Sequence, residues 1–139
     1  MRRIVKIVAM LFCGLLMAAC VPDKGFREEF ESSVKGYNRM LRWQEVVGAG
    51  QMYMEPEGRD TYMTTAESMR RRGVTITDFR ILTMEMLSDR KRGDVMVEFD
   101  YYALPSYRIK TLTYKQDWVY RDVDDKKSWR VKSALPPFD

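Results

Sequence analysis

The sequence predicts an α+β fold, with a long N-terminal helix and a second, short helix packed on a curved, cone-like sheet of four antiparallel strands. The first observation is a change of period at Gly73: apolar residues recur every three or four positions before it and alternate with polar residues after it. The second is that short polar segments separate the alternating runs, which favours neighbouring antiparallel strands. A length of 139 residues suits one domain.

The long helix is predicted within residues 26–50. Its apolar positions are four, four, three and four residues apart, which places these residues on one helical face: Phe26, Phe30, Val34, Tyr37 and Leu41. Acidic residues come early in the segment and basic residues late, an order that suits the helix dipole. Gly48 and Gly50 are expected to end this helix.

The short helix is predicted over residues 61–73, after a connector that contains a proline and a glycine. Asp60 or Thr61 is expected to cap its start, and Gly73 is expected to cap its end. The three arginines at residues 70–72 fall in its last turn, where positive charge is favourable.

The four strands are predicted at residues 74–87, 95–102, 107–120 and 129–135. The second alternates most clearly, and one of its faces carries Val95, Val97, Phe99 and Tyr101. In the third strand the apolar positions change from odd to even numbers, and we expect a bulge near residues 111–113 to cause this change. In the last strand, Trp129, Val131 and Leu135 are expected to share a face.

Residues 1–19 are predicted to be an export signal. A basic start precedes an apolar run of 13 residues, which is shorter than the roughly 20 residues of a membrane-spanning helix. The run ends in "LMAAC", which resembles the lipobox of bacterial lipoproteins: Met17 stands where leucine is usual, and two small residues precede Cys20. An ordinary secretory peptide cut after Ala19 and a buried N-terminal helix remain as alternatives.

The lipobox resemblance implies that Cys20 carries a diacylglyceryl group and an acyl chain such as palmitate, which together anchor the protein in a membrane. It divides the chain into a lipoprotein signal peptide at 1–19, a lipidated cysteine with a short tether at 20–25, and a single domain at 26–139. Val21, rather than aspartate, follows the cysteine, which favours the outer membrane. The expected location is the bacterial envelope, with the domain facing the periplasm.

Charge and residue types exclude several function classes. Three of the 24 basic residues lie in residues 1–19, which hold no acid, so the remainder is nearly balanced and predicts no nucleic-acid partner. The chain has no histidine, which removes histidine bases and histidine metal ligands. Cys13 and Cys20 lie close together in an apolar run, and this pattern is typical neither of a zinc site nor of a disulfide framework. We therefore expect no metal and no cofactor.

The order of predicted elements from Phe26 to Leu135 resembles that of the nuclear transport factor 2-like superfamily, which includes SnoaL-like cyclases and ketosteroid isomerase. The resemblance rests on the long first helix, the short helix before "VTITDFRI", the bent strands and the terminal pair "DWVYRDVDDKKSWRV", which contains Trp118 and Trp129. It implies a cone-shaped domain with a pocket at its open end. A different small α+β lipoprotein fold is the alternative.

The resemblance also implies a candidate chemistry, because ketosteroid isomerase uses carboxylates and a tyrosine. The carboxylates on predicted strands, with three nearby tyrosines, are Asp78, Glu85, Glu98, Asp100 and Asp117, and Tyr101, Tyr102 and Tyr114. The alternative is that these carboxylates form the solvated face of the sheet, as the alternation around Asp100 implies.

Six aromatic residues form the candidate pocket or core: Phe99, Tyr101, Tyr114, Trp118, Tyr120 and Trp129. Three interpretations stay open for them: they line an apolar ligand cavity, they fill the space between the first helix and the sheet, or they form a surface for a partner. The basic runs at residues 70–72 and 90–92 are candidates for contact with anionic headgroups; otherwise they are a solvated helix end and a solvated turn.

The leading hypothesis is a non-enzymatic, lipid-anchored periplasmic domain that binds a partner protein or a small apolar ligand. The alternative is a small-molecule isomerase or dehydratase of the ketosteroid isomerase type, which uses carboxylates and tyrosine. The expected partners are the membrane, through lipid on Cys20, and an envelope protein or an apolar ligand.

Overall fold

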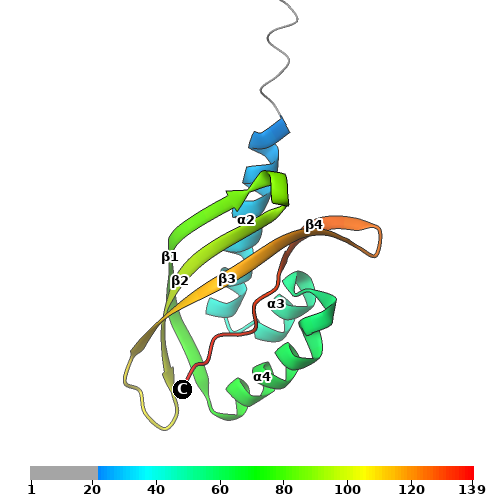
Figure 1. Cartoon of the computed structure of the whole chain (residues 1–139). Coiled ribbons are helices and arrows are strands. Elements are labelled where there is room, and N and C mark those ends of the chain that lie inside the picture. Colours follow the sequence, from blue (N-terminus) through cyan, green and yellow to red (C-terminus); the bar gives the residue numbers. More distant parts are fainter. Residues whose placement is uncertain (1–21) are drawn as a thin grey trace, which may run out of the picture.

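A computed structural model describes residues 22–139 and confirms the α+β class (Figure 1). The helices are α2 (Pro22–Arg42), α3 (Val46–Tyr53) and α4 (Arg59–Arg71), with a short 3₁₀ turn, η1 (Pro56–Gly58). The strands are β1 (Val74–Leu87), β2 (Arg92–Ala103), β3 (Lys110–Val123) and β4 (Lys126–Val131), with η2 (Ser88–Arg90) between the first two. The predicted signal peptide at residues 1–19 and the lipidation site Cys20 lie outside the described residues.

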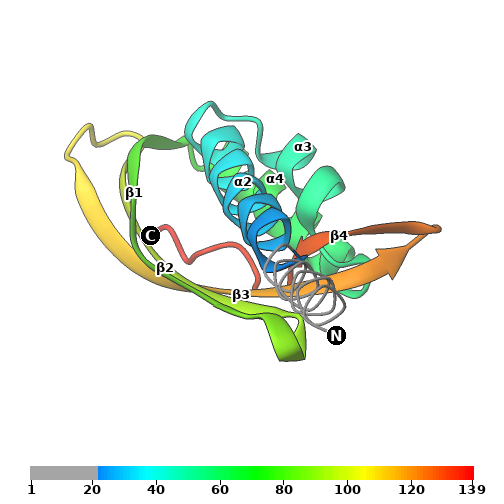
Figure 2. The same ribbon diagram turned by 90° about the horizontal axis from the view of Figure 1, so that it is seen from above.

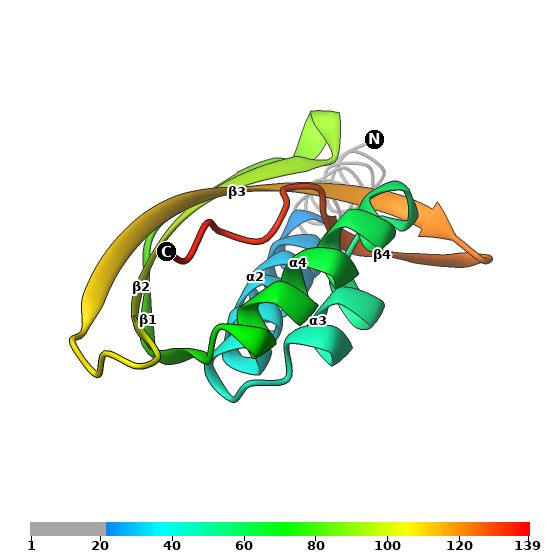
Figure 3. The same ribbon diagram turned by 90° about the horizontal axis from the view of Figure 1, so that it is seen from below.

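The four strands form one antiparallel meander in the order β1-β2-β3-β4. The sheet is curved and open, with β1 and β4 at its edges, and all three helices lie on its concave side (Figures 2 and 3). Short antiparallel connections between successive strands explain this order, because each strand pairs with the one before it. No helix within residues 22–139 is long and apolar enough to cross a membrane.

The core lies between α2 and the concave face of the sheet. The predicted helical face is confirmed, since Phe30, Val34, Tyr37 and Leu41 are all buried. The inward face of β2 is confirmed in the same way, because all four of its members are buried: Val95, Val97, Phe99 and Tyr101. Alternation therefore identified the buried face of the central strand correctly.

The prediction of one helix ending at Gly48 and Gly50 is wrong, because the chain turns between Arg42 and Val46 and starts a new helix, α3. Gln44 adopts a left-handed conformation at the turn, with φ of 64°. Both glycines lie inside α3, and a side chain at Gly50 would collide with the ring of Tyr62 on α4. Gly50 thus permits close packing of two helices and does not end one.

Helix α2 begins at Pro22, inside the stretch expected to be a tether, and proline is tolerated in the first turn of a helix. Helix α4 begins at Arg59 after η1, and neither of the expected caps serves it: its N-cap is Gly58, without a side-chain hydrogen bond. The expected C-terminal glycine is confirmed. Gly73 has a φ of 64°, and its N–H donates to the Arg70 carbonyl at 3.1 Å.

The bulge predicted near residues 111–113 is also wrong. The pairing of β2 with β3 runs from Arg92↔Val119 to Tyr101↔Lys110 without a shift. Residues 107–109 belong to the loop before β3, so their odd-numbered apolar positions are not part of the strand pattern. The register shifts lie instead between β1 and β2, next to Ile76 and Ile81.

The last strand is shorter than predicted at its end and begins earlier. Strand β4 stops at Val131, and the chain then crosses the concave side of the sheet as an extended tail. Leu135 is buried as expected, and Phe138 is buried against Phe99 and Tyr101, with ring centroids 5.6 and 4.9 Å apart. The tail thus completes one end of the core.

Candidate functional site

The six aromatic residues singled out from the sequence are part of the core cluster or pack against it. Phe99, Trp118 and Trp129 are at most 1% exposed and Tyr101 is 5% exposed, while Tyr114 and Tyr120 are half-buried. The two tryptophan rings pack against α2: Phe30 lies 4.6 Å from Trp129 and Tyr37 lies 5.6 Å from Trp118, between ring centroids. Tyr120 reaches the surface as well, where it lines a hollow beside residues 90–92.

Three of the candidate carboxylates surround one arginine on the sheet. Arg80 contacts Asp78 at 3.5 Å, Glu98 at 2.7 Å and Asp100 at 3.0 Å. The hydrogen bond from Arg80 holds the pKa of Asp100 below its usual range, and the Thr111 hydroxyl, which donates to the same carboxylate, adds to this effect. Asp100 is therefore an ionised acceptor, and the contacts of all three carboxylates with Arg80 suit the solvated-face interpretation.

The other two candidate carboxylates lie apart from this group. Asp117 pairs with Lys115 at 3.2 Å, and Glu85 is exposed on β1. The tyrosines are engaged as well: the Tyr101 hydroxyl donates to the Asp139 backbone oxygen at 3.3 Å, and the Tyr114 hydroxyl donates to the Ala134 carbonyl at 3.1 Å. Tyr102 stacks on Tyr107 in the loop after β2. The arrangement does not aim two carboxylates and a tyrosine into one pocket.

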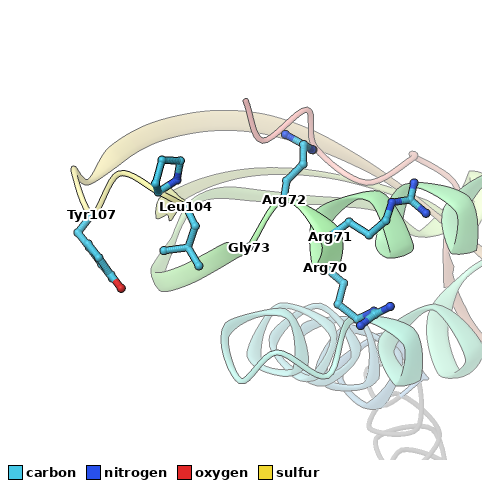
Figure 4. Close-up of a pocket in the computed structure, with 7 residues that line it drawn as sticks. Arg70, Arg71, Arg72, Gly73, Leu104 and Tyr107 are labelled. Atoms are coloured by element: carbon cyan, nitrogen blue, oxygen red, sulfur yellow. The ribbon is translucent and has the colours of Figure 1, made fainter.

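A cleft lies where α4 meets the loop between β2 and β3. One wall is the end of α4, and the other comes from the loop; the lining residues are Arg70, Arg71, Arg72, Gly73, Leu104, Pro105 and Tyr107. Figure 4 shows the arginines on one side of Gly73 and the side chains of Leu104 and Tyr107 on the other. The cleft is open to solvent and has a volume of about 540 Å³.

The local fold explains why these two segments meet. Gly73 ends α4 in a left-handed conformation, and its carbonyl accepts a hydrogen bond from the Leu104 N–H at 3.4 Å. A side chain at position 73 would lie 2.8 Å from the Leu104 side chain. Glycine is therefore needed at this position both for its φ angle and for the close approach of the loop.

The three arginines of the cleft are not equivalent. Arg70 forms two hydrogen bonds with the Glu67 carboxylate, at 2.7 and 3.0 Å, and Arg72 donates to the Phe138 carbonyl. Arg71 contacts Glu67 only at 3.8 Å, so most of its five donors are free to bind a ligand. Arg71 is thus the cation of this wall that is best placed to receive an anionic group.

The opposite wall is apolar and unusually exposed. Leu104 is 49% exposed and Tyr107 is 73% exposed. A second hollow of about 350 Å³ adjoins the cleft and shares Arg70 and Gly73 with it; Val47, on its rim, is also exposed. We call this region, which contains Arg71, Val47, Leu104 and Tyr107, the far-end surface, because it lies at the opposite end of α2 from Pro22 (Figure 1).

A third hollow, of about 300 Å³, lies at the other end of the molecule. It contains the second basic run and is lined by Arg90, Lys91, Arg92, Val119, Tyr120, Arg121 and Lys132. Both basic runs are evident in the sequence, but the residues that face them are not. Lys132 and Arg121 lie about 30 to 40 residues further along the chain, so only the pairing of β3 with β2 and with β4 brings them to the run at 90–92.

Comparisons with known proteins add little to this geometry. No family model matches the sequence, and no curated protein matches it. Among solved structures, the intermembrane space region of the chloroplast protein ARC6 gives a partial match, with a TM-score of 0.43 and 9% sequence identity. The match covers 74% of this chain and 89% of that chain. A match of this size gives no argument about function, and the resemblance to the nuclear transport factor 2-like superfamily stays a prediction.

Proposed function

We propose that this chain is a bacterial lipoprotein, anchored through lipid on Cys20, whose periplasmic domain binds a partner protein at the far-end surface and performs no catalysis. The observation that carries the binding role is the cleft itself, which Arg71 lines together with the exposed side chains of Leu104 and Tyr107 (Figure 4). A filled aromatic interior supports a surface role over an internal apolar ligand site. No observation favours the isomerase alternative.

The chemistry of the cleft favours one kind of occupant. An arginine with free donors binds a carboxylate, and an exposed tyrosine and leucine bind an apolar side chain. We therefore infer that the partner presents a segment in which an acidic side chain lies next to an apolar or aromatic one. Tyrosine and arginine are also the residue types that most often dominate binding energy at protein interfaces.

Helix α2 gives the proposed anchor and the proposed binding surface a fixed relation. It begins two residues after Cys20 and has 21 residues, so its length is about 32 Å at a rise of 1.5 Å per residue. Its buried face joins it firmly to the sheet. A lipid at Cys20 would hold the base of α2 at the bilayer, and the far-end surface would then point into the periplasm.

The anchor is tested by fractionation of cells that express the full chain. Cys20→Ala is expected to remove the protein from the membrane fraction, because one residue carries all of the lipid. Cys13→Ala is the matched control and is expected to leave the membrane fraction unchanged. Membrane association of the Cys20→Ala variant at the wild-type level would show that the anchor assignment is wrong.

The binding surface is tested by photo-crosslinking in intact cells. A photo-reactive amino acid in place of Tyr107 is expected to give a specific protein adduct, and the same amino acid in place of Leu82, an exposed apolar residue on β1, is the control. Arg71→Glu is expected to abolish the adduct because it reverses the charge that meets the partner's carboxylate. Arg27→Glu, at an exposed position of α2, is expected to leave it intact. Equal adducts at positions 82 and 107, or an adduct that survives Arg71→Glu, would contradict the proposal.

A further inference from the structure

The basic hollow between η2 and the end of β4 has four cations that no carboxylate of residues 22–139 pairs with. Within the described residues, no ion pair within 4.0 Å involves Arg90, Lys91, Arg92 or Lys132. The fifth cation, Arg121, pairs with Glu55 at 2.6 Å. The hollow is therefore a concave site with several unneutralised cations and a volume of about 300 Å³.

The backbone holds these cations in place. The Lys91 carbonyl accepts a hydrogen bond from the Tyr120 N–H at 2.9 Å, which fixes the η2 turn against β3. The Lys132 N–H donates to the Asp117 carbonyl at 2.7 Å, which fixes the end of β4 in the same way. Since both segments are tied to one strand, the backbone positions that carry the cations are fixed without a ligand.

The hollow lies next to the start of α2. Tyr120, which lines the hollow, contacts Phe26 with ring centroids 4.8 Å apart. Phe26 is four residues after Pro22, a rise of about 6 Å along the helix. Two further residues reach Cys20, a span of at most about 7 Å. Figure 1 shows the same relation, with η2 and the first turns of α2 at one end of the molecule.

We propose that this hollow docks on the phosphate groups of anionic phospholipids in the membrane that holds the proposed lipid anchor. Arginine and lysine bind phosphate through several donors at once, and arginine also matches its geometry. The chain from Phe26 to Cys20 spans at most about 13 Å, so the bilayer that holds the lipid lies within reach of the hollow. Cations of the hollow that come within the Debye length of about 8–10 Å of the anionic headgroups are attracted to them. Each cation near an anionic leaflet strengthens binding about fivefold.

This inference rests on the proposed anchor and adds an orientation to it. A lipid on Cys20 alone holds the domain at the membrane but lets it tilt. Docking of the hollow fixes the tilt so that η2 faces the headgroups and the far-end surface faces away from them. The first basic run, at residues 70–72, is then a matched comparison, because it has the same charge and lies at the opposite end of α2.

The test uses the full, lipidated chain in vesicles with a quencher attached to a fraction of the headgroups. Since the described domain contains no cysteine, a fluorophore is attached through Ser88→Cys in η2. Ser106→Cys, in the loop between β2 and β3, is the control position. Quenching at position 88 is expected to be greater with 30% anionic phospholipid than with neutral lipid alone. Quenching at position 106 is expected to be weak with both lipids.

The charge requirement is tested with paired variants. Arg90→Gln with Arg92→Gln is expected to remove the difference between anionic and neutral vesicles, whereas Arg70→Gln with Arg71→Gln is expected to leave it unchanged. The same comparison is made by flotation of chains that carry Cys20→Ala and therefore have no lipid. In these chains, Arg90→Gln with Arg92→Gln is expected to weaken binding to anionic vesicles about ten- to thirtyfold. One outcome would overturn docking on lipid: inorganic phosphate occupies the hollow, and the chain binds anionic and neutral vesicles equally. The hollow would then be a site for free phosphate.

The two proposals fail in different ways. A wild-type chain that does not float with neutral vesicles overturns the lipid anchor, and its binding to anionic vesicles still reports on the hollow. A chain that floats with neutral vesicles but shows equal quenching at positions 88 and 106 keeps the anchor and overturns the orientation. If quenching at position 88 survives the loss of both Arg90 and Arg92, the proposed orientation is also overturned.

Discussion

Asn38 and Gln116 form a buried polar pair between α2 and β3, and its removal is predicted to destabilise the fold strongly. The Asn38 amide donates to Gln116 Oε1 at 3.1 Å, and the Gln116 amide donates to Asn38 Oδ1 at 2.8 Å. Both residues are at most 1% exposed. Gln116 Oε1 also accepts a bond from the Trp118 indole at 3.3 Å. The pair thus connects three side chains in a region without water access.

Asn38→Leu keeps the number and branching of the side-chain heavy atoms and removes both hydrogen bonds to Gln116. The Gln116 Nε2 donor then has no protein partner, which costs about 1–3 kcal/mol, and the two lost bonds contribute about 1 kcal/mol each when made. The expected loss in the free energy of unfolding is about 3–5 kcal/mol. Gln116→Met is expected to cost a similar amount, because it leaves Asn38 Oδ1 and the Trp118 indole without partners.

The double variant Asn38→Leu with Gln116→Met removes both halves of the pair together. Replacement of both partners by apolar groups of similar shape is close to neutral, so only the unpaired Trp118 indole remains as a cost of about 1–3 kcal/mol. The double variant is therefore expected to be less destabilised than the sum of the single variants by about 2 kcal/mol or more. This non-additivity is the signature of a direct contact.

The assay is urea unfolding of the purified chain, followed by tryptophan fluorescence, with the slope of the transition unchanged among variants. Gln51→Met, at an exposed position of α3, is the control and is expected to change stability by less than about 0.5 kcal/mol. The reasoning would be refuted if each single variant cost less than about 1 kcal/mol. It would also be refuted if the single costs added to within about 0.5 kcal/mol.

Three further outcomes follow from the geometry. Gly73→Ala is expected to cost about 1–2 kcal/mol by thermal unfolding, because alanine at a φ of 64° is strained and its side chain meets Leu104; an unchanged midpoint would contradict this. Arg80 lowers the folded pKa of Asp100, so this pair stabilises the fold above the ordinary carboxyl pKa and loses its effect as pH falls through the lowered value. Arg80→Gln should therefore lower the urea midpoint at neutral pH and not in strong acid, and an equal effect at both would refute the assignment. Burial raises the pKa of Tyr62, so Tyr62→Phe should leave the ultraviolet titration of the folded protein unchanged up to its alkaline unfolding.

The strands could be predicted from the sequence because one face of the central strand is dry. Every second residue of β2 from Val95 to Tyr101 is buried. An alternation of apolar and polar residues in the sequence indicates a strand of this kind, which is buried on one side only. The end of α2 could not be predicted in the same way. It depends on Gln44, whose amide donates to the Ile76 carbonyl at 3.2 Å, and on Arg42, which donates to the same carbonyl at 3.4 Å. These bonds join segments more than 30 residues apart.

The candidate site was less accessible to sequence reasoning, and for a similar reason. The six aromatic residues were correctly singled out as apolar, but sequence alone left open whether they fill the interior or line a cavity. In the structure Trp129 contacts Phe30 and Trp118 contacts Tyr37 of α2, and Phe99 and Tyr101 are buried as well, which favours the interior. Conversely, Leu104 fell between the predicted strands, and Tyr107 was predicted to start the third strand. Their exposure, and the cleft that they line with Arg71, come only from the meeting of the loop with α4.

The two basic runs show most clearly how similar sequences receive different roles. In residues 70–72, two of the three arginines have internal partners: Arg70 binds Glu67, and Arg72 holds the tail at Phe138. In residues 90–92 no cation has a carboxylate partner within the described part of the chain, and Lys132 adds a fourth charge from another strand. The first run therefore serves mainly to build the end of the domain, with Arg71 left for a single anionic group beside an apolar wall. The second is a cluster suited to a surface of many anions, and it lies at the end of α2 where the proposed anchor would place one.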